Sequence, residues 1–221
     1  MFHVERARRW TELLTAGASE LGVTLTDRQV TELFVYGREL NRWNEKINLT
    51  AIRQDKEVAV KHFLDSLACS KALVPIYDHS LLDIGTGAGF PGLPLKILHP
   101  ELDLTLLEPS LKKTAFLRHL IGTLHVRQAV VISKRIQDVC REPQHQGRFA
   151  YVVTRALGIV QVLPFIQPIL GKRGRLILCR AKPLDDRMDL CGLRKTKELT
   201  YDLPYGYGKR VLTVLEPATS L

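Results

Sequence analysis

Two hydrophobic patterns divide the chain. Up to residue 75, apolar side chains such as Val30, Leu33 and Leu40 recur at helical spacing, and a capping box at 26–29 marks the start of one helix. The pattern predicts helices at 2–20, 26–43 and 55–73. On the polar side of the last helix, four residues share the same spacing and form a strip: His62, Asp65, Ser66 and Cys69.

From residue 80 onward, short apolar runs alternate with helical patterns, which is typical of a parallel α/β sheet. The runs predict strands at 81–84, 103–107, 129–132, 151–154, 175–179 and 211–215, with helices after the first four at about 90–98, 110–122, 134–140 and 158–169. The stretch 182–209 has no clear pattern except a turn at 204–208, which favours an antiparallel last strand. We therefore expect one compact unit in which a helical cap, 1–75, lies on a doubly wound, mostly parallel α/β domain, 76–221.

The composition is that of an ordinary globular protein, with 45% hydrophobic and 25% charged residues. No apolar run approaches the roughly 20 residues of a membrane span, and none follows the early arginines as a signal peptide requires. The four cysteines form no CxxC pair, which argues against a zinc site and against a disulfide framework. We expect a cytoplasmic protein with reduced thiols, no bound metal and no membrane partner.

Positive charge is concentrated in two places and gives a net charge of +9. Between residues 171 and 197, nine Lys or Arg stand against three Asp, and a smaller basic group includes Lys112, Lys113 and Arg118. A charge run taken alone is usually a solvated face, but a basic surface also concentrates polyanions. Because the two clusters flank a glycine-rich segment, they favour an RNA or DNA partner.

That segment, Gly85-Thr86-Gly87-Ala88-Gly89, follows the first predicted strand. In a doubly wound sheet, ligands bind beyond the carboxyl ends of the strands, where a glycine-rich turn lets the backbone approach them. Glu108 closes the second predicted strand, where its carboxylate can accept both hydroxyls of a ribose. The turn and the acid together predict a site for a nucleoside cofactor.

The register of the glycines selects the cofactor. Gly87, Gly89 and Gly92 satisfy G-x-G-x-x-G, which permits a dinucleotide, but a pyrophosphate is poorly served by the carboxylate of Asp83. The register 85, 87, 89 gives Asp-x-Gly-x-Gly-x-Gly, the form associated with S-adenosylmethionine (SAM), in which Asp83 can organise the methionine ammonium end, directly or through water. We therefore predict SAM as the cofactor and a class I, Rossmann-like methyltransferase fold.

The segments at the ends of the later strands constrain the methyl acceptor. Attack on carbon 5 of a pyrimidine needs a cysteine, and Cys179 is expected to be a buried core residue. Methylation of an exocyclic amine usually uses an Asn/Asp-Pro-Pro-aromatic motif, whereas 153–157 reads VTRAL. A ring nitrogen with a free lone pair, such as guanine N7, needs neither, because positioning alone carries most of the catalysis.

Four segments, in this order, resemble the RsmG (GidB) family of bacterial ribosomal RNA methyltransferases: NLTAI at 48–52, KHFLDS at 61–66, DIGTGAGFPGLPL at 83–95 and TRA at 154–156. The similarity extends from about Trp43 to Leu215. It implies transfer of a methyl group from SAM to N7 of one guanosine in 16S rRNA, with the 30S ribosomal subunit as partner. We expect the protein to be a monomer.

The resemblance also assigns roles by position. Arg155 matches an arginine at the mouth of the site that would touch RNA or the methionine carboxylate, and His62 and Asp65 would line the substrate entrance; these three are the candidate catalytic residues. The alternative for His62 and Asp65 is a polar pair that fixes the cap to the sheet. The candidate cofactor-binding residues are Asp83, Gly85, Thr86, Gly87, Gly89, Phe90, Glu108, Arg135, Ile136 and Arg155. The candidate RNA-binding residues are Lys112, Lys113, Arg180, Lys182 and Arg210.

Two positions depart from the family pattern. Arg180-Ala181 stands where Lys-Gly is common, which keeps the charge but changes its geometry. Asp138, where the family often has glutamate, is the nearest carboxylate after the segment expected along the adenine. Two other functions stay open: a SAM-dependent methyltransferase of a small molecule or protein, against which the basic cluster at 171–197 argues, and a non-catalytic RNA-binding factor in ribosome assembly.

Overall fold

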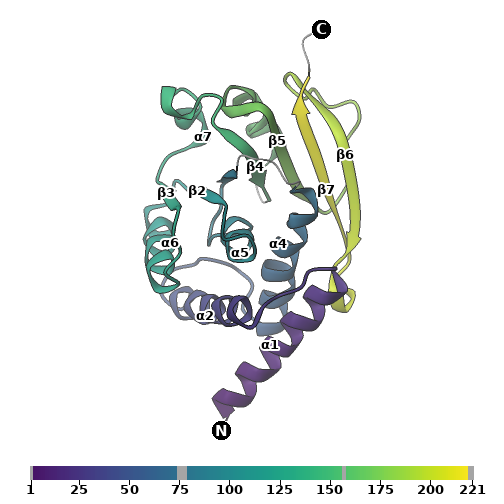
Figure 1. Ribbon diagram of the computed structural model, residues 1–221. Coiled ribbons are helices and arrows are strands. Elements are labelled where there is room, and N and C mark those ends of the chain that lie inside the picture. Colours follow the sequence, from purple (N-terminus) through teal and green to yellow (C-terminus); the bar gives the residue numbers. More distant parts are fainter. Residues whose placement is uncertain (1, 74–78, 156–157, 219–221) are drawn as a thin grey trace.

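A seven-stranded sheet forms the centre of the computed structural model, which describes residues 2–73, 79–155 and 158–218 (Figure 1). Its strand order is β3-β2-β1-β4-β5-β7-β6, with β1 to β5 parallel and β7 antiparallel to both of its neighbours. The strands are β1 (Ser80–Ile84), β2 (Asp103–Leu107), β3 (Ala129–Ile132), β4 (Phe149–Thr154), β5 (Leu170–Arg180), β6 (Leu193–Asp202) and β7 (Lys209–Pro217). The predicted class I, Rossmann-like fold with a mostly parallel sheet and an antiparallel last strand is confirmed.

The edge strand β6 is absent from the sequence prediction. Arg194, Lys195 and Lys197 lie on it and most of its residues are exposed, so the strand has no apolar run to reveal it. Charged side chains of this kind discourage further pairing at a sheet edge. Three of the nine basic residues between 171 and 197 therefore lie on this edge strand, where Lys195 pairs with Asp186 at 2.5 Å.

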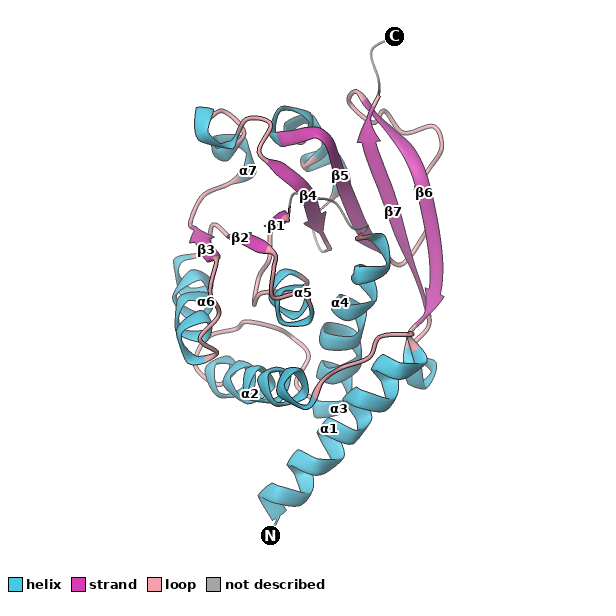
Figure 2. Cartoon of the chain, in the orientation of Figure 1, coloured by secondary structure: helices cyan, strands magenta, loops and turns pink. Residues whose placement is uncertain are grey.

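The N-terminal helices follow the predicted pattern closely. They are α1 (Phe2–Glu20), α2 (Asp27–Asn44), and a continuous rod made of α3 (Asp55–Val58), a π-helical turn η1 (Ala59–Leu64), α4 (Asp65–Ala68) and a 3₁₀ turn η2 (Cys69–Ala72). The capping box is formed as predicted: the Thr26 hydroxyl accepts from the Gln29 backbone N–H, and the Gln29 side chain accepts from the Thr26 N–H. Figure 2 shows α1, α2 and α3 together at one end of the molecule.

Shorter helices connect the parallel strands: α5 (Gly92–Leu98), α6 (Leu111–Thr123) and α7 (Ile136–Val139). The predicted helix at 158–169 is wrong. That stretch forms three 3₁₀ turns instead, η4 (Ile159–Gln161), η5 (Leu163–Phe165) and η6 (Gln167–Ile169). Pro164 and Pro168 are the reason, because each lacks the N–H that an α-helix needs at that point. The remaining 3₁₀ turns are η3 (Pro143–His145) and η7 (Pro204–Gly206).

Alternate strand residues feed two hydrophobic clusters on opposite faces of the sheet. Leu81 packs with the cap helices and α5, whereas its neighbour Leu82 packs with α7 and the 3₁₀ turns. Aromatic rings link the cap to the turn after β1: Tyr36 lies 5.0 Å, centroid to centroid, from both Phe63 in the cap and Phe90 in the turn. The expected boundary between 1–75 and 76–221 falls within 74–78, outside the described residues.

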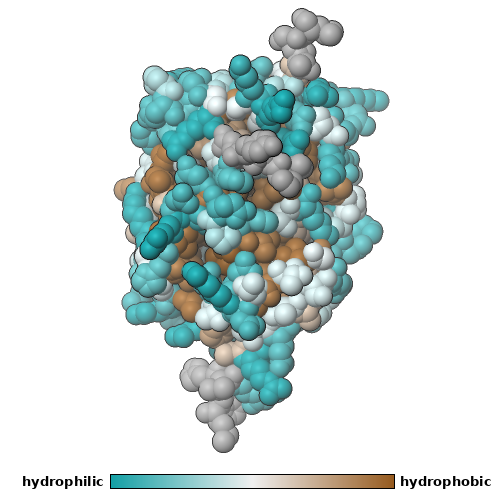
Figure 3. All heavy atoms as spheres, viewed as in Figure 1, coloured by the Kyte–Doolittle hydropathy of each residue, from teal (hydrophilic) through white to brown (hydrophobic). Residues whose placement is uncertain are grey.

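Hydrophobic side chains are unevenly distributed over the surface. In the face seen in Figure 3, they gather toward the middle and hydrophilic ones surround them. In the described part of the chain, no helix combines the length and the apolar character needed to cross a membrane. Nor do its His, Cys, Asp and Glu side chains form a group of three or more that could hold a metal ion.

Candidate functional site

The glycine-rich turn after β1 is shaped by backbone conformations that favour glycine. Gly85, Gly87 and Gly89 have φ angles of 67°, 62° and 101°. A Cβ on Gly89 would lie 2.5 Å from the Tyr36 hydroxyl, so this glycine is needed where the turn packs against the cap. Among the residues that the structure describes, a Cβ on Gly87 would meet only the Gly85 carbonyl, at 4.0 Å, which leaves space in front of it.

Asp83 lies beneath this turn. The side chain is fully buried, and its Oδ2 accepts hydrogen bonds from the Thr86 hydroxyl at 2.6 Å and from the Gly92 N–H at 2.7 Å. Burial raises the pKa of this carboxyl to about 6. Asp83 therefore ties the two ends of the turn together, and it is not among the described residues that line the cavity, although the sequence suggested that it serves the methionine ammonium end.

Glu108 stands at the end of β2 with its carboxylate against the turn. Its Oε2 accepts from the Gly87 N–H and its Oε1 from the Ser110 N–H, both at 3.0 Å. The residue is 6% exposed, and that exposed part faces the cavity. A carboxylate has about four acceptor positions, so two remain for hydroxyl groups of a ligand.

A cavity of about 480 Å³ opens beyond the carboxyl ends of β1, β2 and β4. This is the size expected of a site for a cofactor-sized molecule, and β1 and β4 are the strands between which the strand order reverses. One side is formed by the glycine turn, Glu108 and the segment 134–137. The other side is formed by the cap and the segment after β4, through Leu49, Thr50, His62, Phe90, Arg155, Gln161 and Val162.

The three candidate catalytic residues come together on this second side. An Nη atom of Arg155 lies 3.0 Å from His62 Nδ1, and the other donates to the Lys61 carbonyl at 3.0 Å and approaches Asp65 Oδ2 at 3.5 Å. The guanidinium carbon also lies 5.4 Å from the centre of the Phe90 ring. The cluster crosses from the loop after β4 to the π-helical turn of the cap.

Asp65 is buried and lies behind His62 and Arg155 as seen from the cavity. Its Oδ1 accepts a hydrogen bond from the Tyr201 hydroxyl at 2.7 Å and lies 3.8 Å from Arg210 Nε. The residue does not line the cavity. Asp65 thus connects the cap to β6 and β7, as the alternative interpretation of a fixing pair describes, while His62 reaches the cavity wall.

His62 is held as a neutral ring. Burial, with the nearby charges of Arg155 and Lys61, lowers the pKa of His62 to about 3. Its ring stacks on Phe90 with centroids 4.7 Å apart, and its Nε2 lies 2.8 Å from the Thr50 hydroxyl. Both ring nitrogens are therefore engaged, which leaves neither free to exchange a proton with a ligand at neutral pH.

The expected adenine-binding segment lies on the first side of the cavity, with the glycine turn and Glu108. Arg135, Ile136 and Gln137 line it, and Ile136 is 5% exposed, so it offers a small apolar contact surface. Asp138 is exposed and is not among the lining residues, whereas its neighbour Gln137 is. Of the candidate cofactor-binding residues, the described lining contains Gly85, Thr86, Gly87, Phe90, Glu108, Arg135, Ile136 and Arg155, whereas Asp83 and Gly89 lie behind it.

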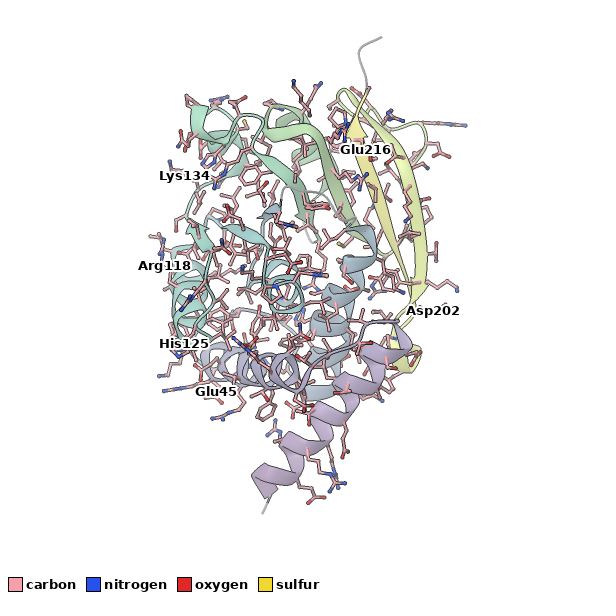
Figure 4. All side chains as sticks on the ribbon, in the orientation of Figure 1. Glu45, Arg118, His125, Lys134, Asp202 and Glu216 are labelled. Carbon is pink, nitrogen blue, oxygen red and sulfur yellow. The ribbon has the colours of Figure 1, made fainter. Side chains whose placement is uncertain are left out.

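The candidate RNA-binding residues do not form one surface. Lys113 lines the cavity and Lys112 is exposed beside it on the first turn of α6. Lys182 is exposed after β5, where Arg180 has a buried Nη1 with no partner among the described residues, and Arg210 faces Asp65. Figure 4 places Lys134 between β3 and α7, and it is a further basic residue of the cavity rim.

Several lining residues were missed from the sequence: Leu49, Thr50, Lys134, Gln161 and Val162. The signal available for the first two was the break in helical pattern after residue 44, within a segment that the family resemblance already includes. Gln161 and Val162 lie on the 3₁₀ turns that replace the wrongly predicted helix. Cys179 does not line the cavity; it is 4% exposed, with its sulfur 2.9 Å from that of Cys69.

Known proteins resemble this chain in sequence and in fold. Residues 29–198 match the family described as rRNA small subunit methyltransferase G (GidB). The chain is 38% identical over 213 residues to the ribosomal RNA small subunit methyltransferase G of Pelotomaculum thermopropionicum, covering 92% of this chain and 89% of that protein. The protein of the same name from Geotalea uraniireducens is 36% identical over 213 residues, with 93% and 95% covered. A SAM dependent methyltransferase from Aquifex aeolicus shares the fold, with a TM-score of 0.52, 11% identity, and 72% of this chain and 93% of that chain covered.

Proposed function

The chain belongs to the rRNA small subunit methyltransferase G family, and on this premise we propose that it transfers the methyl group of SAM to N7 of a guanosine in the 16S rRNA of the small ribosomal subunit. One observation carries the proposal most directly. A single cavity combines the glycine turn and Glu108 on one side with the cap residues and Arg155 on the other. The two sides correspond to a cofactor half and an acceptor half.

The cofactor half fits SAM on three independent points. The space in front of Gly87 admits a ligand against the backbone, because the Gly85 carbonyl, 4.0 Å away, is the one atom of the described residues that a Cβ there would meet within 4 Å. Glu108 keeps acceptor positions for two ribose hydroxyls, and Ile136 offers an apolar surface for a flat base. SAM would supply an electrophilic methyl group on a sulfonium centre.

The acceptor half needs to position a base rather than to remove a proton. When guanine N7 forms the new bond to carbon, the sulfur–carbon bond breaks and the positive charge moves to the base, so no proton is released. A neutral His62 with both nitrogens bonded fits this requirement, because the reaction asks for no general base. Fixing the base and excluding water then account for most of the rate enhancement that the protein contributes.

Basic residues at the rim would bind the RNA backbone. Lys112 and Lys113 open α6 beside the cavity, where cations gain nothing from the helix dipole, and in the described ranges neither has an acidic partner within 4 Å. We propose that they contact phosphates, with Arg180, Lys182 and Arg210 as the further candidates. The proposal includes a monomeric enzyme that acts in the cytoplasm.

The Lys112→Ala/Lys113→Ala double variant tests this contact. Each lost phosphate contact should lower the slope of log affinity against log salt by about 1 for the small subunit, while SAM binding stays unchanged. Arg28→Ala is the matched control, since Arg28 is an exposed cation on α2 that pairs with Glu32 and does not line the cavity. An unchanged slope in the double variant would contradict the assignment.

The function itself is tested by transfer of a labelled methyl group from SAM to purified 30S subunits that lack base modification. Nucleoside analysis of the RNA then shows which base carries the label. We expect label in 7-methylguanosine of the 16S rRNA and none in 50S subunits. If calorimetry shows SAM binding but no label enters RNA, the cofactor assignment stands and the acceptor is wrong. A small-molecule or protein acceptor, or a non-catalytic role in assembly, would then be the remaining options.

A further inference from the structure

Thr50 lies at the cavity wall and its backbone is fixed by hydrogen bonds. Neither the sequence analysis nor the proposed mechanism assigns it a role. It lies between α2 and α3, where the side chain of Asn44 fixes the backbone. Asn44 Oδ1 accepts from the N–H groups of Leu49 at 2.8 Å and Thr50 at 3.0 Å, and Asn44 Nδ2 donates to the Thr50 carbonyl at 3.0 Å. Asn44 itself is 5% exposed, so this clamp is shielded from water.

The direction of the hydrogen bonds around Thr50 can be worked out from Arg155. A guanidinium only donates, so His62 Nδ1 must accept from it, at 3.0 Å. A neutral imidazole carries its proton on the other nitrogen, so His62 Nε2–H donates to the Thr50 hydroxyl oxygen at 2.8 Å.

The hydroxyl oxygen of Thr50 accepts a second hydrogen bond, from the Ile52 N–H at 3.1 Å. Both of its lone pairs are then used. Within 2–73, 79–155 and 158–218, no acceptor for the hydroxyl proton is found, and Thr50 lines the cavity. The relay from Arg155 through His62 therefore makes Thr50 a hydrogen-bond donor toward whatever occupies the acceptor half.

We propose that Thr50 is a specificity-determining residue that donates its hydroxyl proton to O6 of the target guanine. The inference rests on the proposed function and adds how the base is chosen. Guanine presents N7 and O6 as adjacent acceptors on one edge, whereas adenine presents N7 beside an N6 amino donor. A group that can only donate therefore accepts guanine and opposes adenine.

The position of Thr50 agrees with this role. We place the ribose of SAM at Glu108 and its adenine along Ile136, so that the sulfonium end extends toward Arg155, His62 and Thr50, which line the same cavity. A guanine whose N7 faces that methyl group presents O6 to the same wall. The stacked rings of Phe90 and His62 give the wall a rigid base.

Two variants separate the hydroxyl from the shape of the side chain. Thr50→Val keeps the branched shape and removes the donor, and Thr50→Ser keeps the donor. The probe is a reconstituted 30S subunit in which the guanosine that the wild-type protein methylates is replaced by 2-aminopurine riboside, which keeps N7 but lacks O6. Single-turnover methyl transfer to both substrates and SAM affinity by calorimetry are measured for all three proteins.

For the wild-type protein and Thr50→Ser, removal of O6 should slow transfer about ten-fold, as loss of one hydrogen bond to a base predicts. Thr50→Val should be slow on guanosine by about the same factor, and its further loss on 2-aminopurine should be about ten-fold smaller than that of the wild-type protein. SAM affinity should be equal in all three. A purely structural role of Thr50, in holding His62, would slow both substrates alike and leave the ratio at its wild-type value.

Two results would overturn this inference and leave the proposed function intact. The first is a ratio of rates on the guanosine and 2-aminopurine substrates that is the same in Thr50→Val as in the wild-type protein. The second is a loss of SAM affinity in Thr50→Val that matches its loss of rate, which would assign the hydroxyl to the cofactor. If the wild-type protein methylates no guanosine N7 in the 30S subunit, the proposed function fails and takes this inference with it. The wild-type reaction thus distinguishes the two failures.

Discussion

The two halves of the cavity are built in different ways. The cofactor half is built around a run of consecutive backbone: a glycine turn with three positive φ angles, held to the Glu108 carboxylate by the Gly87 N–H. The acceptor half is made of side chains from distant segments, in which Arg155 reaches His62 across 93 positions of the chain and Tyr201 reaches Asp65 across 136. The first half is local and the second depends on the packing of the cap, so damage to each should have different consequences.

The largest effect is expected where the two halves touch. Gly89→Ala places a Cβ 2.5 Å from the Tyr36 hydroxyl at a φ of 101°, so strain and overpacking together should lower the free energy of unfolding by about 3 kcal/mol or more. Gly87→Ala is the matched control, since its Cβ has space; it should cost about 1 kcal/mol of stability but weaken SAM binding. Urea unfolding and calorimetry measure both. Equal stability of the two variants would contradict the packing argument.

The next effect belongs to the cofactor half. Glu108→Gln keeps the shape of the side chain but removes the charge that accepts hydrogen bonds from ribose hydroxyls, so the Kd for SAM should rise about 30-fold. Binding to the small subunit should stay within about two-fold of wild type, because Glu108 touches no proposed RNA contact. A Kd for SAM equal to that of wild type would remove Glu108 from the cofactor site.

The pH dependence of stability sharpens the account of the acceptor half. The pKa of His62 is lowered from its ordinary value of 6.5 to about 3 in the folded protein. Between these two pH values the His62 ring binds a proton in the unfolded chain but not in the folded one. The free energy of unfolding therefore decreases as pH falls from about 6.5 toward 3. Asp83 has the opposite effect, because its pKa is raised to about 6. Between about pH 4 and 6 its carboxyl binds a proton in the folded protein but not in the unfolded chain, so this group increases the free energy of unfolding as pH falls.

His62→Gln removes the first contribution and leaves the second. Relative to wild type, the variant should therefore gain stability as pH falls from about 6.5, by up to about 1.4 kcal/mol per pH unit. Chemical unfolding at a series of pH values gives the difference directly. Parallel stability curves for the two proteins would show that the ring of His62 is not held neutral.

The smallest effect concerns the bond that joins the halves. The Tyr36 hydroxyl donates to the Ala88 carbonyl at 2.6 Å, in a fully buried position. Tyr36→Phe should lower the free energy of unfolding by about 1 kcal/mol and leave the Kd for SAM within about three-fold of wild type. A loss of SAM binding larger than the loss of stability would mean that this bond shapes the glycine turn itself.

The same contrast explains what the sequence could predict. The positions of six strands, the glycine turn and Glu108 follow from local patterns: apolar runs, glycines at 85, 87 and 89, and an acid at the end of the second strand. The expected helix at 158–169 was wrong, since two prolines outweigh the apolar spacing, and β6 was missed for want of an apolar run. Hydrogen-bond directions at Thr50 depend on Arg155 and His62, which only the folded chain brings together.

The central claim is that the acceptor half serves methyl transfer while the cofactor half binds SAM, and Arg155→Ala tests it most directly. Loss of the guanidinium removes the bonds to His62 and to the Lys61 carbonyl, so single-turnover methylation of unmodified 30S subunits should fall about 100-fold or more, while the Kd for SAM by calorimetry stays within about three-fold. Wild-type activity on the subunit, or a rise in the Kd for SAM as large as the fall in rate, would contradict the division of the cavity into two halves.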